Sequence, residues 1–156
     1  MSDRETITFL PLVKAYPALS KTYGEVSCIA GVQYTPDRAL GAAEPRWIRL
    51  YPVPFRDLDG NQQFSKYQPI QVAVQSHSGD TRPETRRPDR ESITIVGDPI
   101  PSSDSWVRRR RFVEPLMAGS MCEIRRAQEE VGTSLGIFRP KRVFDLEIEA
   151  VDVKAE

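Results

Sequence analysis

The sequence predicts a β-rich α+β fold: a small OB-like barrel, or a curved antiparallel sheet, with a two-helix insertion near the C-terminus. Three observations favour this class: 13 prolines in 156 residues, several short segments in which apolar and polar residues alternate, and helical periodicity only late in the chain. The length suits one hydrophobic core. We therefore expect residues 1–156 to form a single OB-like domain with a helical insertion at about 104–131.

Two strands are expected early in the chain. Residues 6–16 are rich in β-branched and aromatic side chains and end before Pro17, and residues 25–34 alternate from Val26 to Tyr34. A turn at 20–24 separates them. The alternation assigns Cys28 and Ala30 to the buried side of the second strand.

Residues 46–53 predict a strand with two different faces, after a loop at 35–45. Trp47, Arg49 and Tyr51 alternate with Ile48 and Leu50, so one face is aliphatic and the other carries rings and a cation. The aromatic face is a candidate binding surface. In the alternative interpretation, the two rings pack in the core and the arginine pairs with an acid.

The remaining elements are short. A helical turn is expected at 54–58, strands at 67–76 and 92–97, and a final strand that alternates over 144–150, with one buried and one acidic face. Residues 77–91 contain arginines between prolines, which indicates an ordered surface loop.

Two helices are expected between these last strands. Residues 106–117 fit a short amphipathic helix capped by Asp104 or Ser105. Ser120 and Glu123 form a capping box for a second helix, and Gly132 stands where a C-terminal glycine belongs.

Arginine dominates the cations of a chain whose formal net charge is zero. Guanidinium groups pair bidentately with phosphates, and aromatic rings stack on unpaired bases, so the two together favour a surface for single-stranded nucleic acid. In the alternative interpretation, the arginines are solvated or paired with neighbouring acids. The candidate nucleic-acid-binding residues are Trp47, Arg49, Tyr51, Tyr67, Arg82, Arg86, Arg87, Arg90, Arg108 and Arg109.

No catalytic, metal or cofactor site is expected. The chain has one histidine and two cysteines that are far apart, too few ligands for a structural zinc site, so Cys28 and Cys122 are expected to be small buried side chains. The acids at 80–91 are expected to form salt bridges with the neighbouring arginines instead of binding a cation. The first residues lack the features of a secretion signal and no apolar run has the length of a membrane span, so we expect a cytoplasmic protein without membrane contact.

The segments Cys28-Ile-Ala-Gly31 and Trp47-Ile-Arg-Leu-Tyr-Pro52 resemble a group of poorly characterised bacterial proteins described as OB-domain-containing. The likeness covers residues 25–56, and a looser one touches residues 134–140. It implies an OB-like binding module of the kind encountered beside nucleic-acid-processing or phage-defence genes, and it assigns no catalytic residue. Unlike that group, this chain is expected to carry one barrel instead of two in tandem.

Three functions follow from these expectations. The leading hypothesis is a non-enzymatic accessory subunit that binds nucleic acid through its arginines and rings. The second is an adaptor that docks on a larger protein partner by strand addition through its acidic last strand, residues 144–153. The third is a sensor of an anionic nucleotide held by Trp47 and Arg49. The oligomeric state stays open.

Overall fold

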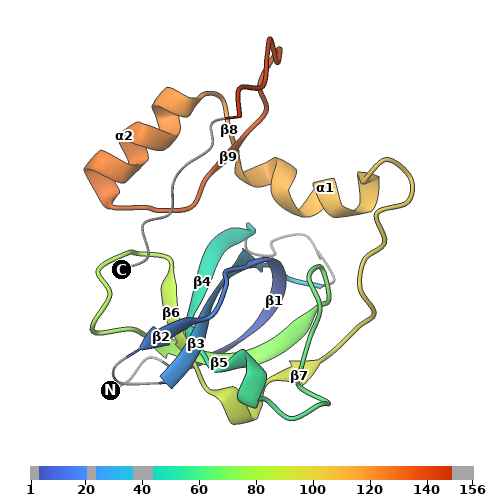
Figure 1. The fold of residues 1–156 in the computed structure, drawn as a ribbon, viewed down its shortest axis with the longest axis vertical. Coiled ribbons are helices and arrows are strands. Elements are labelled where there is room, and N and C mark those ends of the chain that lie inside the picture. Colours follow the sequence, from blue (N-terminus) through green and yellow to red (C-terminus); the bar gives the residue numbers. More distant parts are fainter. Residues whose placement is uncertain (1–3, 21–23, 37–43, 149–156) are drawn as a thin grey trace.

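The computed structural model describes residues 4–20, 24–36 and 44–148, and the first two thirds of the chain form a closed five-stranded barrel (Figure 1). Its strands are β1 (Glu5–Lys14), β3 (Gly24–Gln33), β4 (Arg46–Val53), β5 (Ile70–Ser76) and β6 (Thr85–Pro88). They follow the order β1-β3-β4-β6-β5, and pairing between β1 and β5 closes the barrel. The β4–β6 ladder is parallel, and the other ladders between barrel strands are antiparallel.

This order confirms the predicted fold class. When the barrel strands alone are numbered 1 to 5 along the chain, their spatial order is 1-2-3-5-4 and back to 1. A small barrel of five strands with one out-of-sequence neighbour is the OB-like arrangement, in which strands 2 and 3 form the usual binding face. In this chain, those two strands are β3 and β4.

Short elements decorate the barrel. The strand β2 (Ala18–Ser20) pairs with β3, and β7 (Thr94–Ile95) pairs with β5. The 3₁₀ turn η1 (Phe55–Asp57) follows β4, as the sequence predicted, and η2 (Arg90–Ser92) follows β6. The predicted turn at 20–24 and loop at 35–45 fall largely outside the described residues.

The barrel interior is filled by apolar side chains, aliphatic residues together with Phe9 and Phe64. Ile48 and Leu50 of β4 belong to this core, so the predicted inward face of residues 46–53 is confirmed. Gly31 lies where β3 passes close to β1: a Cβ added there would lie 2.1 Å from the Leu10 carbonyl oxygen and 2.7 Å from the Phe9 ring. Any side chain at this position would therefore displace the backbone or Phe9.

The C-terminal part of the described chain lies on one side of the barrel (Figure 1). It contains α1 (Val107–Val113), η3 (Glu114–Leu116), β8 (Met117–Ala118), α2 (Met121–Val131) and β9 (Ile137–Phe138), and β8 pairs in parallel with β9. We call residues 117–138 the arm. None of the described helices has the length and apolar character needed to cross a membrane.

The predicted caps of α2 are confirmed. The Ser120 hydroxyl accepts a hydrogen bond from the Glu123 backbone N–H at 3.2 Å, and Gly132 ends the helix with φ of 78°. The predicted cap of α1 was wrong. Its N-cap is Trp106, which makes no side-chain cap bond, while Asp104 and Ser105 precede it with positive φ.

Three further predictions were wrong. Residues 85–88 were expected in a surface loop but form the barrel strand β6, in which Thr85 is buried. A register shift in the β3–β4 ladder between Ser27 and Ile29 changes the alternation of β3, so Ile29 enters the core and Cys28 is half-buried. Cys122 is exposed.

The final strand expected at 144–150 is also absent from the part that the structure describes. Residues 141–148 have no strand pairing and all are exposed; residues 149 and 150 lie outside the described chain. The alternation of Phe144, Leu146 and Ile148 with acids therefore does not mark a buried face. Their exposed fractions are 84%, 78% and 85%.

Candidate functional site

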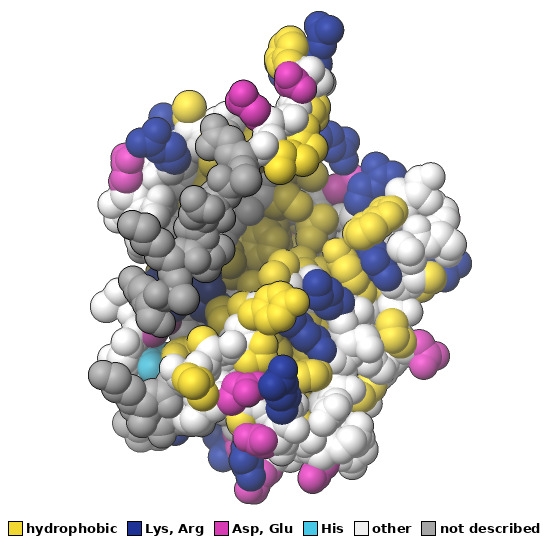
Figure 2. Space-filling view, in the orientation of Figure 1, with side chains coloured by type: hydrophobic (Ala, Val, Ile, Leu, Met, Phe, Trp, Pro, Cys, Tyr) yellow, Lys and Arg dark blue, Asp and Glu magenta, His cyan; other side chains and the backbone are white. Residues whose placement is uncertain are grey.

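A groove of about 400 Å³ separates the β1, β3 and β4 side of the barrel from α1 and the arm. Figure 2 shows it as a hollow lined by hydrophobic side chains, with basic side chains at its margin. The barrel contributes Leu12, Val13, Ala30, Trp47 and Tyr67, and the opposite wall is built from Trp106, Arg109, Arg110, Val113, Leu135, Gly136 and Ile137. The outer face of these barrel strands is thus one wall of a cleft.

Trp47 lies on the outer face of β4 because the strand alternates about the core residues Ile48 and Leu50. Its ladder partner on β3 is Val32. The Trp47 side chain is half-buried and lines the groove. It is therefore placed outside the core, as the binding-surface interpretation of this strand required.

The helical wall of the groove is set by an unusual backbone segment. Asp104, Ser105 and Trp106 have φ of 66°, 54° and 67°, a left-handed conformation that side-chain-bearing residues rarely adopt. Such strained residues cost about 1–3 kcal/mol each and persist where the surroundings enforce them, often at functional sites. Here the three residues directly precede α1, and the chain is placed so that Trp106 and the first turn of the helix lie beside the groove.

Tyr67, Trp106 and Arg109 form a stack at one end of the groove. The Arg109 guanidinium carbon lies 3.9 Å from the Tyr67 ring centroid and 4.9 Å from that of Trp106. The two rings meet edge to face at 5.9 Å. Because Arg109 Nε also donates to the Ile100 carbonyl at 2.8 Å, this arginine is fixed in place, whereas the Trp106 side chain keeps 49% of its surface exposed.

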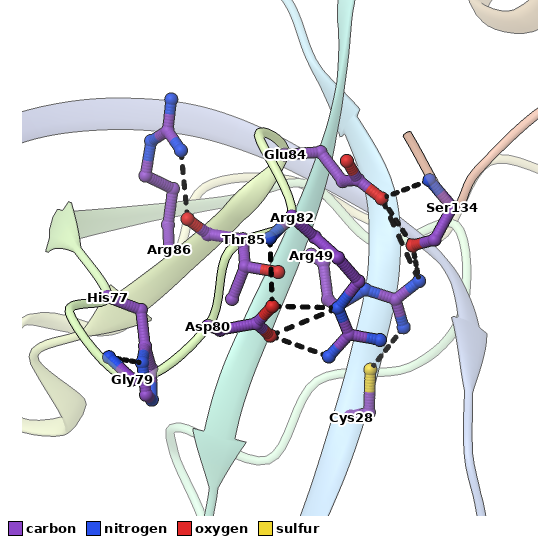
Figure 3. Close-up of polar contacts among 10 residues, drawn as sticks. All are labelled: Cys28, Arg49, His77, Gly79, Asp80, Arg82, Glu84, Thr85, Arg86 and Ser134. Atoms are coloured by element: carbon purple, nitrogen blue, oxygen red, sulfur yellow. Dashed lines mark hydrogen bonds and ion pairs between the residues drawn. The ribbon is translucent and has the colours of Figure 1, made fainter. Parts of the chain in front are cut away.

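The arm contacts the barrel through a polar cluster of Cys28, Arg49, Glu84 and Ser134 (Figure 3). The Ser134 backbone N–H donates to Glu84 Oε1 at 2.8 Å, and its hydroxyl donates to the same oxygen. Arg49 Nη2 donates to the Ser134 hydroxyl oxygen at 2.6 Å, and Arg49 Nη1 to Cys28 Sγ at 3.0 Å. Arg49 Nη2 and Glu84 Oε1 are 3.9 Å apart, an ion pair whose side chains are 13% and 5% exposed.

This cluster leaves polar atoms unpaired. Within the described part of the chain, Arg49 Nε and Glu84 Oε2 are buried from solvent and have no hydrogen-bond partner. A buried polar atom without a partner costs free energy, so native proteins pair almost all of them. The Arg49–Glu84 pair therefore has one further donor and one further acceptor to satisfy.

The arginines of residues 82–90 do not line the groove. Arg82 is held by the Asp80 carboxylate, with its Nε 2.9 Å from Oδ1 and its Nη2 2.5 Å from Oδ2 (Figure 3). Hydrogen bonds from the Arg82 side chain hold the pKa of Asp80 well below its usual range, and the same pairing raises the pKa of Arg82. Arg86 Nη1 donates to the Pro83 and Thr85 carbonyls at 2.8 Å each.

A second pocket of about 580 Å³ lies on another part of the barrel, where Arg87 and Arg90 line it with Arg4 and Asp57. The salt bridges expected between the acids at 80–91 and their neighbouring arginines are confirmed for Asp80, while Glu84 and Asp89 pair with arginines from elsewhere in the chain. Asp80 binds its neighbour Arg82, whereas Glu84 pairs with Arg49 and Asp89 with Arg4.

The predicted site residues thus fall into separate groups. Trp47, Tyr67 and Arg109 meet at the groove, and Arg49 lies in the polar cluster beside it. Tyr51 packs against His77 with ring centroids 6.0 Å apart, and Arg108 points away and pairs with Asp104 at 3.5 Å. Arg82, Arg86, Arg87 and Arg90 lie elsewhere on the barrel.

Sequence reasoning missed Trp106 and Arg110 as groove residues, although a signal was present. Trp106, Arg109, Arg110 and Val113 have the spacing i, i+3, i+4 and i+7, which places them on one helix face. Glu84 and Ser134 were also missed. They are 50 residues apart in the sequence, and no local pattern predicts their contact.

Among residues 4–20, 24–36 and 44–148, no group of three His, Cys, Asp or Glu side chains could hold a metal ion. The groove and its polar cluster offer rings, guanidinium groups and one carboxyl group. These groups can stack on planar ligands, bind anions and accept hydrogen bonds.

Comparisons with known proteins gave one match. A family model described as a domain of unknown function, DUF8758, matches residues 5–115. This span contains the barrel and α1, and it ends before the arm. The searches of curated proteins and of solved structures returned no match.

Proposed function

The chain belongs to the DUF8758 family of domains of unknown function, and we propose that it binds single-stranded nucleic acid in the groove, as a non-enzymatic accessory subunit of a bacterial nucleic-acid-processing or defence system. The observation that carries this proposal is the place of the groove. It lies along β1, β3 and β4 of a barrel with the OB-like strand order, and β3 and β4 belong to the face that OB folds use for oligonucleotides.

The groove lining fits an unpaired base. Trp47 on one wall and Trp106 on the other are half-exposed rings, and base–aromatic stacking contributes about 1–3 kcal/mol per base. A base within a duplex is already stacked on its neighbours, so a groove of this kind favours a single strand.

Phosphate contacts would come from the helical wall. Arg110 lines the groove and is tied to the Ser105 carbonyl by one hydrogen bond of 2.9 Å, which leaves other guanidinium donors to a ligand. Arg109 adds a second positive charge behind it. Each phosphate neutralised makes the binding more sensitive to salt, by a slope of about −0.7 for single strands.

Tryptophan fluorescence tests the proposal directly, because the chain has two tryptophans and both line the groove. Titration with single-stranded DNA or RNA should quench or shift the emission, and the affinity should fall as salt rises. Duplexes of equal length should bind more weakly. An unchanged emission at low salt with every strand type would reject the proposal.

A matched pair of variants on α1 localises the contact. Arg110→Glu should weaken single-strand binding about tenfold or more, since it replaces a groove cation by an anion. Arg108→Glu makes the same charge change two residues away, on a side chain outside the groove that pairs with Asp104. Equal losses in the two variants would show a general charge effect and contradict a groove site.

An adaptor role is the second candidate, and one observation favours it. In residues 143–148 the apolar side chains are exposed and alternate with Asp145 and Glu147, a pattern that suits addition to a partner's sheet edge. This candidate predicts a complex with a larger protein that survives nuclease treatment and is lost in Phe144→Asp/Leu146→Asp. A nuclease-sensitive complex would favour the groove function instead.

A further inference from the structure

We propose that the Arg49–Glu84 pair is a recognition site for the Watson–Crick edge of a guanine base, and that Ser134 occupies this site when no ligand is bound. The inference rests on the proposed function and gives it a sequence preference. It starts from two observations: a buried ion pair with unpaired atoms, and an internal group that bridges the pair.

Ser134 makes three hydrogen bonds to the Arg49–Glu84 pair. It offers two donors, its backbone N–H and its hydroxyl, to the Glu84 carboxyl group, and one acceptor, its hydroxyl oxygen, to Arg49 (Figure 3). Both donors reach Oε1, so Oε2 stays unpaired. A ligand that supplies two adjacent donors and one neighbouring acceptor would match the pair better than Ser134 does.

Guanine has this pattern among the common bases. Its Watson–Crick edge carries the O6 acceptor followed by the N1–H and N2–H donors, so the two donors can reach both carboxyl oxygens while O6 accepts from the guanidinium group. Adenine and cytosine present one amine donor beside acceptors, and thymine and uracil present one N–H between two carbonyls. None of these offers two adjacent donors to a carboxyl group.

The Arg49–Glu84 pair lies close enough to the groove to contact a base that is held there. Arg49 follows Trp47 by two positions on the same face of β4, a distance of about 7 Å along the strand. Ser134 precedes Leu135, which lines the groove. A base that enters the groove beside Trp47 can thus meet the polar cluster at its edge.

Ser134 belongs to a part of the chain that a ligand can displace. The side chains of residues 117–138 are all at least partly exposed, and this arm lies outside the matched family domain. Displacing Ser134 would therefore break few apolar contacts, and the base would restore the three hydrogen bonds that Ser134 loses.

The test measures binding of the full chain to single strands of ten nucleotides, which are all thymidine except for one central base that is varied. A single guanine should raise the affinity about tenfold over the all-thymine strand, a typical discrimination for bidentate base contacts. Hypoxanthine, which lacks the N2 amine, should lose most of this gain, and adenine or cytosine should show none. Equal affinity for all strands would overturn the guanine site and leave single-strand binding intact.

Two variants assign the preference to the pair. Glu84→Gln should abolish the guanine advantage and keep all-thymine binding, while Glu91→Gln, an exposed acid outside the cluster, should keep both. Should Glu84→Gln fail to fold, Ser134→Ala serves in its place. It removes the internal bridging hydroxyl and should raise guanine affinity a few-fold without changing the all-thymine strand; no gain would count against the proposal.

Free mononucleotides separate the failure of this inference from that of the proposed function. Guanosine monophosphate at millimolar concentration should raise the Tm of the full chain, and adenosine monophosphate should raise it less. Stabilisation by the guanine nucleotide without binding of any strand would keep the site and reject the single-strand function. Equal effects of the two nucleotides would reject the guanine site.

Discussion

The barrel and the arm differ in how they are held together. Among the described residues, every fully buried apolar side chain lies between Ile7 and Ile93, and residues 94–148 contain none. The arm is hydrogen-bonded to the barrel through the polar cluster at Ser134, and its partly exposed Leu135 and Ile137 line the groove between them. Because burial of apolar surface is the main stabilising term, the two regions should differ greatly in local stability.

This difference gives the groove one rigid wall, which is the barrel, and one wall that includes the more weakly held arm. The barrel fixes Trp47 and Arg49 on a strand whose opposite face is locked into the core. The arm supplies the part of the facing wall formed by Leu135, Gly136 and Ile137, and it has no buried core of its own, so its displacement should cost little free energy. Binding surfaces drawn from the low-stability part of a protein, on a rigid support, are a common arrangement.

The largest expected effect is in hydrogen exchange. Backbone amides of β3 and β4 should exchange at the rate of global unfolding, while those of α2 should exchange through local opening, about two orders of magnitude or more faster. Exchange measured by mass spectrometry on peptides from both regions checks this. Similar protection of α2 and β4 would break the comparison.

Core truncation should separate the regions by several kcal/mol. Phe9 is fully buried in the barrel, and Phe9→Ala should cost about 3–5 kcal/mol of unfolding free energy through lost burial and the cavity left behind. Val131, at the end of α2, is 63% exposed, and Val131→Ala should change the stability by about 0.5 kcal/mol or less. Denaturant unfolding of both variants gives the two values; comparable losses would show that the arm shares the barrel's core.

Removal of a ring should affect binding according to its place in the groove. Trp47→Ala should weaken single-strand affinity by about 1–3 kcal/mol, the usual range for one stacked base. Tyr16→Ala is the matched control, because this aromatic side chain is 96% exposed and lies outside the groove lining. Fluorescence anisotropy with a labelled strand measures both, and an equal loss in the control would contradict a stacking site at Trp47.

Much of the barrel was predictable because its strands carry the alternation that one buried face imposes. The bounds of β4 and its two faces follow from the alternation of Trp47 and Arg49 with Ile48 and Leu50. The strand β6 was not predictable in this way. Its sequence, Thr-Arg-Arg-Pro, has no apolar alternation, and it is placed by pairing with β4 and β5 instead of by its own pattern.

The prediction of a buried final strand was wrong for the opposite reason. Phe144, Leu146 and Ile148 alternate as cleanly as a buried strand, yet they are exposed because no sheet edge of the described chain receives them. Periodicity reports that a face is apolar, and only the tertiary structure decides what covers it. The site shows the same limit: Trp47 was found from strand spacing, whereas the Glu84–Ser134 contact depends on folding alone.

The smallest expected effect concerns the loop that presents Glu84 to the arm. Since Arg82 lowers the pKa of Asp80 in the folded chain, this carboxyl group stabilises the fold at pH values above its unfolded pKa of about 3.9. That contribution is lost as the pH falls below this value towards the folded pKa. Arg82 is 41% exposed, so solvent screening limits the contribution to about 1 kcal/mol or less.

Asp80→Asn should therefore lower the Tm by about 2–4 °C at pH 7 for a domain of this size. The difference from the unchanged protein should shrink between about pH 4 and pH 2, where the wild-type carboxyl group becomes protonated. Asp98→Asn, an exposed acid, should leave the Tm unchanged at both ends of the range. A constant deficit of the Asp80 variant across this pH range would mean that the side chain stabilises the loop by its shape and not by its charge.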